Sequence, residues 1–300
     1  MSQITPPLVS IIINCFNGEK YLRDALDSVL NQSYRNWEII FFDNCSTDQS
    51  EEIFKSYTDS RLKYYKANDH ISSLYEARNR AIDCANGEYF AFLDVDDWWE
   101  SEKLFEQMYA FKDQSIGLVC SNFYIINEVT GRTKKRFKKN IDNEININTL
   151  LKSYYVGLLT IVVSRRVYES LEKKFDPRFH IIGDFDFVLR VLEHSSIRCL
   201  NDPLAYYRIH GNNETIKSGK KIIEEYSIWI EEFEGKYKNK FMNIAHIKNR
   251  LYFFKSIEYL IENNINKWLS EIAKIRDINL LIKAVISFLI PKKYLYLLKI

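Results

Sequence analysis

The amino-acid sequence predicts an α/β protein, with a doubly wound, mostly parallel sheet followed by a C-terminal helical extension. Short apolar runs rich in β-branched or aromatic residues are expected to be strands, at residues 8–14, 37–42, 62–65 and 89–93. Stretches with helical periodicity lie between them, at residues 21–32, from about residue 49, and at 75–85. Strands that alternate with helices at this spacing specify a parallel sheet.

Beyond about residue 220 the composition changes to long helical patterns, at residues 222–233, 243–263, 265–275 and 278–290. We therefore expect two domains, residues 1–219 and residues 220–300. The last stretches are apolar with flanking lysines, and they are too short to span a bilayer. They either pack on the core or anchor the chain at a membrane interface.

Polar residues predict where the first helices begin and end. Asn17 is expected to cap the first helix, and Ser46 or Thr47 the second, because short polar side chains accept hydrogen bonds from a first helical turn. Asn86-Gly87 is expected to end the helix at 75–85 in the left-handed conformation.

The middle of the chain predicts a further set of elements. Strands are expected at residues 117–126, 156–164 and 204–209, and helices at 103–111, 165–173 and directly after residue 186. A turn at 128–131 precedes the cationic run RTKKRFKK at 132–139. That run is either an exposed hairpin arm or a contact to phosphate.

Composition excludes few functions, but it does indicate a compartment. The net charge of the 300 residues is +2; residues 216–300 carry sixteen Lys/Arg and nine Asp/Glu, a balance of +7, which leaves −5 for the rest. The basic C-terminal part, and not the acidic body, is therefore expected to meet an anionic surface. Five scattered cysteines without a C-x-x-C pair, and no signal-peptide pattern at the N-terminus, predict a reduced cytoplasmic chain.

Three carboxylates follow the buried strand at 89–93 within the sequence GEYFAFLDVDDWW. Open α/β sheets bind ligands beyond the carboxyl ends of their strands. Asp94 and Asp96 there suit a hard divalent cation, Mn²⁺ or Mg²⁺, shared with a diphosphate. Asp97 is expected to cap the helix that follows.

Two later stretches carry further candidates. Asp184 and Asp186 precede a helix, so each is either a helix-terminal charge or a general base. Arg208 and His210 are two residues apart and share a strand face, and a cation beside an imidazole suits a diphosphate with its metal.

Other nucleotide-binding classes are less compatible with the first turn, CFNGEKYL. It lacks the G-x-G-x-x-G sequence of dinucleotide-binding dehydrogenases, and the chain has no P-loop. A nucleotidyltransferase would need a Gly-rich first loop bearing Arg or Lys, which this turn does not resemble.

The chain resembles the family 2 glycosyltransferases, which have the GT-A fold. The resemblance is carried by VSIIINCFNGEKYLRDALDSVLNQSYRNWEIIFFDNCSTDQS, YEARNRAIDCANGEYFAFLDVDDWW, FHIIGDFDFVLR and YRIHGNN, and it fades after about residue 220. Two departures concern the donor side: Asn44 stands where the family has a second Asp, and residues 70–74 lack the usual glycine turn. Gly183 stands where the family often has Glu.

The resemblance implies a role for each candidate residue. Asp184 would be the catalytic base, with Asp186 the alternative. Asp96, Asp94 and His210 would hold the metal. Nucleotide-sugar contacts would come from six residues: Asn14, Phe16, Asp43 (reading the uracil edge), Arg78, Asp94 and Arg208.

The resemblance also implies the reaction: metal-dependent, inverting transfer of a sugar from a nucleotide-diphosphate donor, expected to be a UDP-sugar. The expected acceptor is a hydroxyl of a lipid-linked or surface-polysaccharide glycan. The basic, apolar tail leads us to expect the reaction at the inner face of the plasma membrane. The alternative is a catalytically inactive nucleotide-sugar-binding module that acts through its helical tail. No nucleic-acid partner is expected.

Overall fold

The computed structural model describes residues 6–128, 130–211, 213, 219–237, 244–295 and 298. These residues separate into two compact units. The first comprises residues 1–146, 155–177 and 183–210, and the second comprises residues 147–154, 178–182 and 211–300. The domain boundary predicted at residues 219–220 adjoins residues outside the described ones and stays a prediction.

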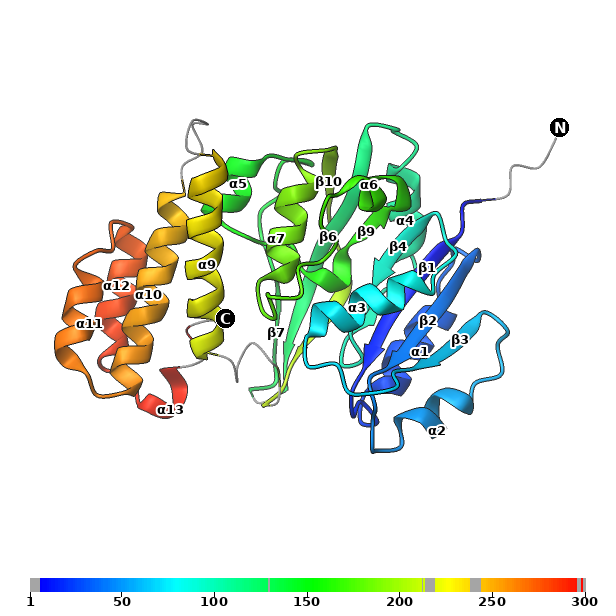
Figure 1. Cartoon of the computed structure of the whole chain (residues 1–300), viewed down its shortest axis with the longest axis horizontal. Coiled ribbons are helices and arrows are strands. Elements are labelled where there is room, and N and C mark those ends of the chain that lie inside the picture. Colours follow the sequence, from blue (N-terminus) through cyan, green and yellow to red (C-terminus); the bar gives the residue numbers. More distant parts are fainter. Residues whose placement is uncertain are drawn as a thin grey trace. The chain divides into compact units, whose positions relative to one another are not determined.

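The first unit is built on one mixed sheet (Figure 1). The described strands are β1 (Val9–Cys15), β2 (Trp37–Asp43), β3 (Leu62–Lys66), β4 (Tyr89–Phe92), β5 (Trp98–Trp99), β6 (Ile116–Asn127), β7 (Arg132–Lys135), β8 (Glu144–Ile145), β9 (Val162–Ser164) and β10 (Ser196–Ile209). Their main order is β3-β2-β1-β4-β9-β6-β10-β5. Strands β3, β2, β1 and β4 pair in parallel, as do β6 and β10, whereas β9 and β5 pair antiparallel with their neighbours. The predicted mostly parallel α/β sheet is confirmed.

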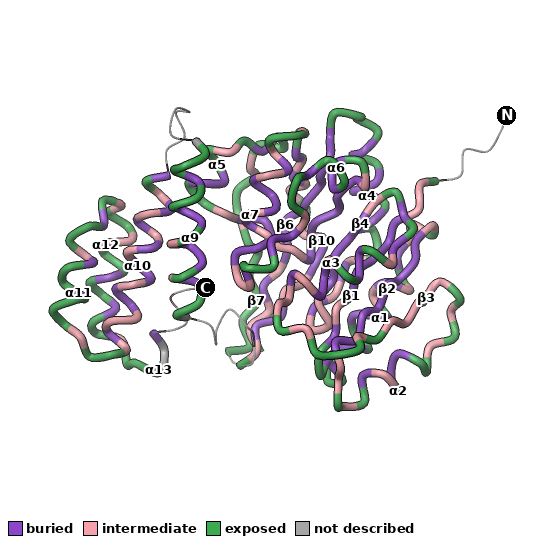
Figure 2. The backbone as a smooth tube through the Cα atoms, viewed as in Figure 1, coloured by how far each residue is buried: buried purple, intermediate pink, exposed green. Residues whose placement is uncertain are grey.

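The helices of this unit cover the sheet at defined places. They are α1 (Leu22–Leu30), α2 (Ser50–Lys55), α3 (Leu74–Asp83), α4 (Lys103–Ala110), α6 (Arg165–Ser170) and α7 (Gly183–Val191). Helix α3 packs on β1 and β2, and α4 packs on β6 and β10. The central strands are buried on both faces because their residues are almost all apolar, which Figure 2 shows as purple tube through β1, β2 and β4.

The cationic run at 132–139 begins with β7, which pairs antiparallel with β6 and is exposed at all four positions. The turn between β6 and β7 includes Gly131 at φ +66°, a conformation that favours glycine. The predicted hairpin arm is therefore confirmed. Val129, in the same turn, lies outside the described residues.

The three predicted helix ends are wrong. At the first two helices the predicted capping side chains bind other partners, since Asn17 pairs with Ser46 and Thr47. Asn17 adopts φ +55°, and its Oδ1 accepts from Thr47 N, at 2.8 Å, whereas α1 begins after Tyr21 without a side-chain cap. Helix α2 is likewise preceded by Gln49 and not capped by Ser46 or Thr47. Neither Asn86 nor Gly87 has a positive φ, and α3 ends at Cys84 in a right-handed conformation.

Two further expectations change in the structure. The predicted strand at 156–164 is a 3-10 turn, η1 (Leu158–Thr160), followed by the short strand β9. Helix α4 begins after Glu102, so Asp97 does not cap it. The intervening Trp98 and Trp99 form β5 against β10, a pairing between residues about a hundred positions apart.

The second unit is helical. Its described helices are α5 (Ile147–Lys152), α9 (Gly219–Tyr237), α10 (Ala245–Ile261), α11 (Ile265–Ile272), α12 (Ile278–Ser287) and α13 (Lys292–Leu295). The helices predicted after residue 220 are confirmed, although the start expected at residue 243, and residues 296, 297, 299 and 300 of the terminal stretch, lie outside the described residues. No helix in the described part of the chain is both long and apolar enough to cross a membrane.

Candidate functional site

The carboxyl ends of β1, β2 and β4 meet at one edge of the sheet. Because the three strands pair in parallel, Cys15 at the end of β1 lies opposite Asp43 at the end of β2, and Leu93 N, beyond β4, donates to Ile12 O. The residues that follow each strand therefore share one surface, which we call the carboxyl edge. This is where ligands bind in open α/β sheets.

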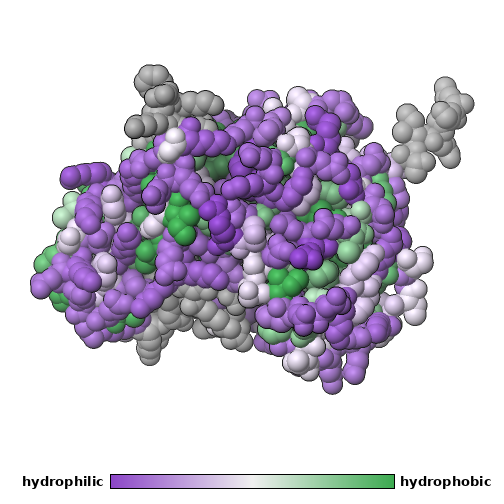
Figure 3. Space-filling view, in the orientation of Figure 1, coloured by the Kyte–Doolittle hydropathy of each residue, from purple (hydrophilic) through white to green (hydrophobic). Residues whose placement is uncertain are grey.

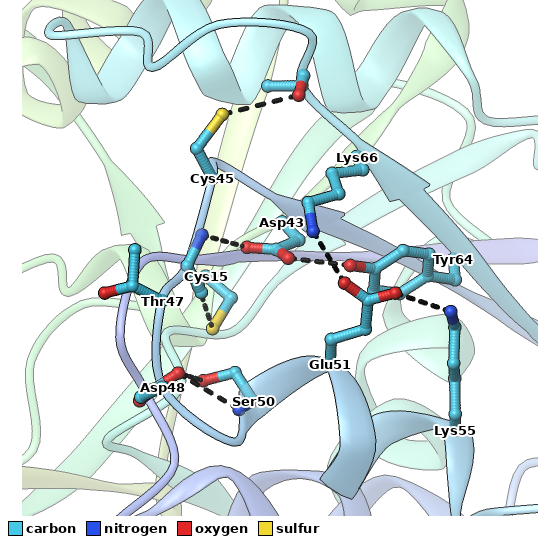
Figure 4. A network of polar contacts seen from close by, with 12 residues as sticks. Cys15, Asp43, Cys45, Thr47, Asp48, Ser50, Glu51, Lys55, Tyr64 and Lys66 are labelled. Atoms are coloured by element: carbon cyan, nitrogen blue, oxygen red, sulfur yellow. Dashed lines mark hydrogen bonds and ion pairs between the residues drawn. The ribbon is translucent and has the colours of Figure 1, made fainter.

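Asp43 is fully buried at this edge, and both of its carboxylate oxygens accept hydrogen bonds (Figure 4). Ser46 N donates to Oδ1 at 2.8 Å and Tyr64 Oη donates to Oδ2 at 2.7 Å. Burial and the Asp43 carboxylate raise the pKa of Tyr64, which therefore stays a neutral donor. Asp43 thus fixes the loop after β2, and its predicted role in reading a base stays a prediction.

Asn14 and Phe16 lie at the end of β1 and directly after it. Both polar atoms of the Asn14 amide are buried without a hydrogen-bond partner among the described residues. Buried amide groups are normally paired, so this one is suited to a ligand. Phe16 is 52% exposed and its ring lies 4.6 Å from that of His70, which makes an aromatic surface at the same edge.

Arg78 reaches this edge from α3 and is 2% exposed. Its Nη2 donates to Asp94 Oδ1 at 2.8 Å, whereas its Nη1 is buried without a partner in the described structure. Although 38% of the Asp94 side chain is exposed, its desolvation raises the pKa of that carboxyl; the Arg78 guanidinium opposes this and Asp96 reinforces it. The carboxylates here are therefore short of positive charge.

Asp96 and His210 come together, as their assignment to a single metal site requires. His210 Nε2 lies 2.9 Å from Asp96 Oδ2, and the His210 ring stacks on Tyr21 at a centroid distance of 5.2 Å. The strand end of β10 thus delivers an imidazole to the carboxylates that follow β4.

Asp97 is 1% exposed and accepts a hydrogen bond from the backbone N of Arg208, at 2.8 Å. Its second oxygen is buried without a partner among the described atoms. Burial raises the pKa of Asp97 well above its usual value, and the charges of Asp96 and Asp94 add to this. The predicted helix cap is instead a link between the loop after β4 and strand β10.

Arg208 is held by protein groups on every side. Its side chain donates to Asp96 O at 2.8 Å, to Glu128 Oε1 at 2.8 Å and to Asp24 Oδ2 at 2.6 Å. The guanidinium carbon lies 4.4 Å from the ring centres of both Tyr21 and Trp98. These contacts make Arg208 a brace between the ends of β10 and β4, and its predicted contact with the donor stays a prediction.

Asp184 lies in the first turn of α7 and is connected to the carboxyl edge through Tyr75. Its backbone N donates to Tyr75 Oη at 3.0 Å, and the Tyr75 ring centre lies 5.0 Å from the guanidinium carbon of Arg78. A Cβ at position 183 would lie 2.4 Å from the same ring. The close approach of Tyr75 thus explains why this chain has Gly183, where the family often has Glu.

Asp186 is engaged differently from Asp184. Its Oδ2 lies 2.7 Å from Arg190 Nη2 and 2.9 Å from Arg190 Nε, an ion pair within α7. Arg190 also donates to the backbone oxygens of Lys173 and Lys174. Asp186 therefore fastens α7 to the segment before it, which leaves Asp184 the better candidate for a base.

The contribution of three residues was not predicted from the sequence: Tyr75, Asp24 and Glu128. Tyr75 is the first residue of the stretch YEARNRAIDCANGEYFAFLDVDDWW that carries the family resemblance, so its position in the sequence could have marked it as a candidate. Asp24 and Glu128 are separated from Arg208 by 184 and 80 residues, and no local pattern marks them.

The described side chains at this edge are too few to hold a metal ion by themselves. In the part of the chain that the structure describes, no three His, Cys, Asp or Glu side chains form a group able to hold a metal ion. Mg²⁺ and related ions, however, are commonly bound through one or two carboxylates together with substrate phosphates and water. Asp96, His210 and the under-neutralised Asp94 fit a site of that kind.

Known proteins match this chain in sequence and in fold. The family model described as glycosyl transferase family 2 matches residues 10–180, more than half of the chain. The chain is 29% identical over 225 residues to the UDP-Glc:α-D-GlcNAc-diphosphoundecaprenol β-1,3-glucosyltransferase WfaP of Escherichia coli, which covers 74% of this chain and 85% of WfaP.

Two solved structures share the fold. S. aureus TarS 1–349 in complex with UDP-GlcNAc has a TM-score of 0.64 at 17% identity, covering 96% of this chain and 90% of that one. The mannosyltransferase PcManGT from Pyrobaculum calidifontis, in complex with GDP-Man and Mn²⁺, has a TM-score of 0.62 at 14% identity, covering 95% and 88%. The expected GT-A fold is thereby confirmed, and the chain belongs to glycosyl transferase family 2.

Proposed function

We propose that this glycosyltransferase moves a sugar from a UDP-sugar to a hydroxyl group of a lipid-linked or surface-polysaccharide glycan, with inversion at the anomeric carbon. The reaction would take place on the cytoplasmic side of the plasma membrane. WfaP, whose name specifies UDP-Glc and a diphosphoundecaprenol-linked acceptor, supports this class of donor and acceptor. The complex of TarS with UDP-GlcNAc supports the choice of UDP.

One observation carries the proposal. The carboxyl edge has buried N–H groups without a hydrogen-bond partner in the described structure, beside carboxylates that the nearby positive charges only partly neutralise. Asn14 and Arg78 present buried polar atoms that have no partner in the described structure. The pKa values of Asp94 and Asp97 are raised, first because both carboxyls are desolvated and second because other aspartates lie close to them. A diphosphate together with a divalent cation would satisfy both needs, since the anion pairs with the donors and the cation with the carboxylates.

Asp94, Asp96 and His210 are the residues that would hold Mn²⁺ or Mg²⁺. When bound, such a cation would neutralise charge on the leaving diphosphate. Arg78 would hold Asp94 in place, and Arg208, braced by Asp24 and Glu128, would fix the backbone of Asp96. The Arg208 brace would thereby help to set the position of the metal ligands, and its contact with the donor remains part of the proposal.

Asp184 would act as the general base. The acceptor oxygen forms a bond to the anomeric carbon, the bond from that carbon to the diphosphate oxygen breaks, and the hydroxyl proton passes to the Asp184 carboxylate. The first turn of a helix favours the charged form of an acidic side chain. Tyr75 would hold Asp184 at a fixed place relative to Arg78, and so relative to the donor.

The test compares two carboxylates of α7. Asp184→Asn should lower the transfer rate by about 10²–10⁴-fold, the usual contribution of a general base, and should leave UDP protection against thermal unfolding intact. Asp186→Asn is the matched control: it should lower stability by removing the pair with Arg190, while the rate per folded molecule stays unchanged. Loss of transfer in Asp186→Asn alone would make Asp186 the base.

The second candidate function is a nucleotide-sugar-binding module without catalysis. It would be favoured by UDP protection of the wild type together with neither transfer to any glycan acceptor nor slow hydrolysis of the donor. A screen of UDP-, GDP- and dTDP-sugars by thermal protection, followed by hydrolysis assays, separates the two.

A further inference from the structure

Exposed hydrophobic side chains are concentrated in one segment of the second unit. Of the twelve large hydrophobic side chains that are exposed in the described structure, eight lie between residues 265 and 289: Ile265, Leu269, Ile278, Ile282, Val285, Ile286, Phe288 and Leu289. On the side shown in Figure 3, the C-terminal helices are mostly hydrophilic, with a few separate green spots among the purple. Scattered single hydrophobic residues need no explanation, but a cluster of this kind marks an interaction site.

Helix α12 has an exposed apolar face opposite the face that it buries. Its buried face is formed by Ala284 and Ser287, and the helix packs on α10. Residues 278, 282, 285, 286 and 289 follow the spacing of a single helical face, and they lie on the opposite side, 50–81% exposed. Asp277 caps the helix by accepting from Leu280 N, at 3.0 Å. The exposed stripe therefore belongs to a well-formed helix and is not a loose end.

Helix α11 extends this surface. Ile265 and Leu269 are one turn apart and exposed, and the neighbouring Trp268 is buried, with its ring 5.3 Å from that of Phe288. We call the exposed hydrophobic residues of the two helices, together with Phe288 and Leu289, the α11–α12 face.

The charges around this face are positive. Residues 265–293 contain six Lys/Arg and two acidic residues, a balance of +4. Both acidic residues are used internally: Glu271 is buried and pairs with Lys274 at 2.7 Å, and Asp277 is the cap of α12. Lys283 is exposed on α12, three residues before Ile286 of the apolar stripe. Lys267 is exposed on α11, with its Nζ 5.4 Å from the ring centre of Tyr259.

We propose that the α11–α12 face binds the surface of an anionic phospholipid bilayer. Aliphatic side chains flanked by lysines suit the boundary between acyl chains and anionic headgroups. The centre of a protein–protein interface would instead favour aromatic, Met and Arg side chains and be depleted of Lys. The face shares no residue with the carboxyl edge, so this inference is independent of the donor chemistry. It accounts for how the proposed enzyme would meet a lipid-linked acceptor.

The test is flotation of the full chain with vesicles of phosphatidylcholine alone or mixed with phosphatidylglycerol. The wild type should float with the anionic vesicles and much less with the neutral ones. Ile282→Gln/Ile286→Gln should lower the partition coefficient at least about tenfold, because two isoleucine side chains no longer leave water. Ile228→Gln, at an isolated exposed position on α9, is the matched control and should bind as the wild type does.

A second variant separates charge from apolar burial. Lys283→Gln should weaken binding to anionic vesicles about fivefold, the usual effect of one lysine near such a surface, and should not change binding to neutral vesicles. Because these positions are exposed, the thermal unfolding temperature and UDP protection of the variants should match the wild type. These two measurements distinguish a loss of membrane binding by the α11–α12 face from a failure of the proposed reaction.

Three results would overturn the proposal. The wild type would fail to float with anionic vesicles, or the double variant would float as well as the wild type. Alternatively, the wild type would be a dimer in solution that Ile282→Gln/Ile286→Gln converts to a monomer, without any vesicle binding. In that last case the partner of the face is a second copy of this chain.

Discussion

The parallel strands β1, β2 and β4 have buried carboxylates at or near both of their ends, and the two ends differ in how these charges are compensated. We call the end opposite the carboxyl edge the amino edge. At the amino edge, Glu38 in β2 is 4% exposed and accepts from Ser10 Oγ at 2.6 Å, Asn86 N at 2.7 Å and Lys63 Nζ at 2.5 Å. Burial alone would raise the pKa of Glu38, but the bonds from Lys63, Ser10 and Asn86 outweigh it and the pKa is lowered.

At the carboxyl edge the balance is reversed. Burial raises the pKa of Asp94 and of Asp97, and the charge of Asp96 adds to both, as that of Asp94 does for Asp97. Arg78 offsets only part of this for Asp94, and Arg208 only part of it for Asp97. The comparison teaches that Glu38 is fully compensated by the protein, as a structural group is. The carboxylates after β4 are compensated less completely within the described structure, which supports the proposed cation site.

The largest effect is expected from Asp96→Asn. We expect transfer to fall at least about 100-fold, since even the partners of metal ligands are worth 10–100-fold. Stability should not fall, because the change removes one of three neighbouring like charges. The measurements are donor turnover with Mn²⁺ and the free energy of unfolding. An unchanged turnover would remove the distinction between the two edges.

Glu38→Gln should give the opposite result. Loss of the charged acceptor should lower the free energy of unfolding by about 2 kcal/mol, the typical value of hydrogen bonds to an ionised group. Turnover per folded molecule should match the wild type. Urea titration together with activity at a saturating donor concentration checks both. A fall in turnover larger than the loss of folded protein would mean that the amino edge also serves the reaction.

A smaller effect, in acid, sharpens the assignment of Glu38. Its folded pKa is lower than the unfolded value of about 4.3, so its contribution is present above that pH and is lost as the pH falls through the folded pKa. The difference in unfolding free energy between the wild type and Glu38→Gln should be constant from about pH 6 to 8 and shrink below about pH 4. A difference that persists or grows in acid would contradict a lowered pKa.

The sheet was predictable from the sequence because each strand is marked by the pattern of residues within it. The runs that became β1, β2 and β4 are almost wholly apolar, and the strands alternate with amphipathic helices, so their type and order follow from periodicity. The residues that follow them, Asp94 and Asp96 above all, could be placed at one edge by the parallel pairing alone.

What could not be predicted depends on contacts between distant segments. The side chain of Asn17 accepts a hydrogen bond from Thr47 N instead of capping a helix. The Asp97 carboxylate accepts one from the backbone N of Arg208, 111 residues away. The pairing of β10 with β6 is interrupted by register shifts. An alternation of buried and exposed residues along the strand does not predict where such shifts occur. The partners of Arg208, Asp24 and Glu128, were missed for the same reason, because no local rule predicts contacts between segments so far apart in the sequence.

The most direct test of the central claim is the affinity for UDP with and without Mn²⁺, measured by titration calorimetry on the wild type, Asp96→Asn and the control Glu38→Gln. If the carboxylates after β4 await a cation, Mn²⁺ should tighten UDP binding at least about tenfold in the wild type and in Glu38→Gln, within the range that metal-site groups usually contribute. Asp96→Asn should show no such dependence. Equal UDP affinity with and without Mn²⁺ in the wild type, or full Mn²⁺ dependence in Asp96→Asn, would contradict the account.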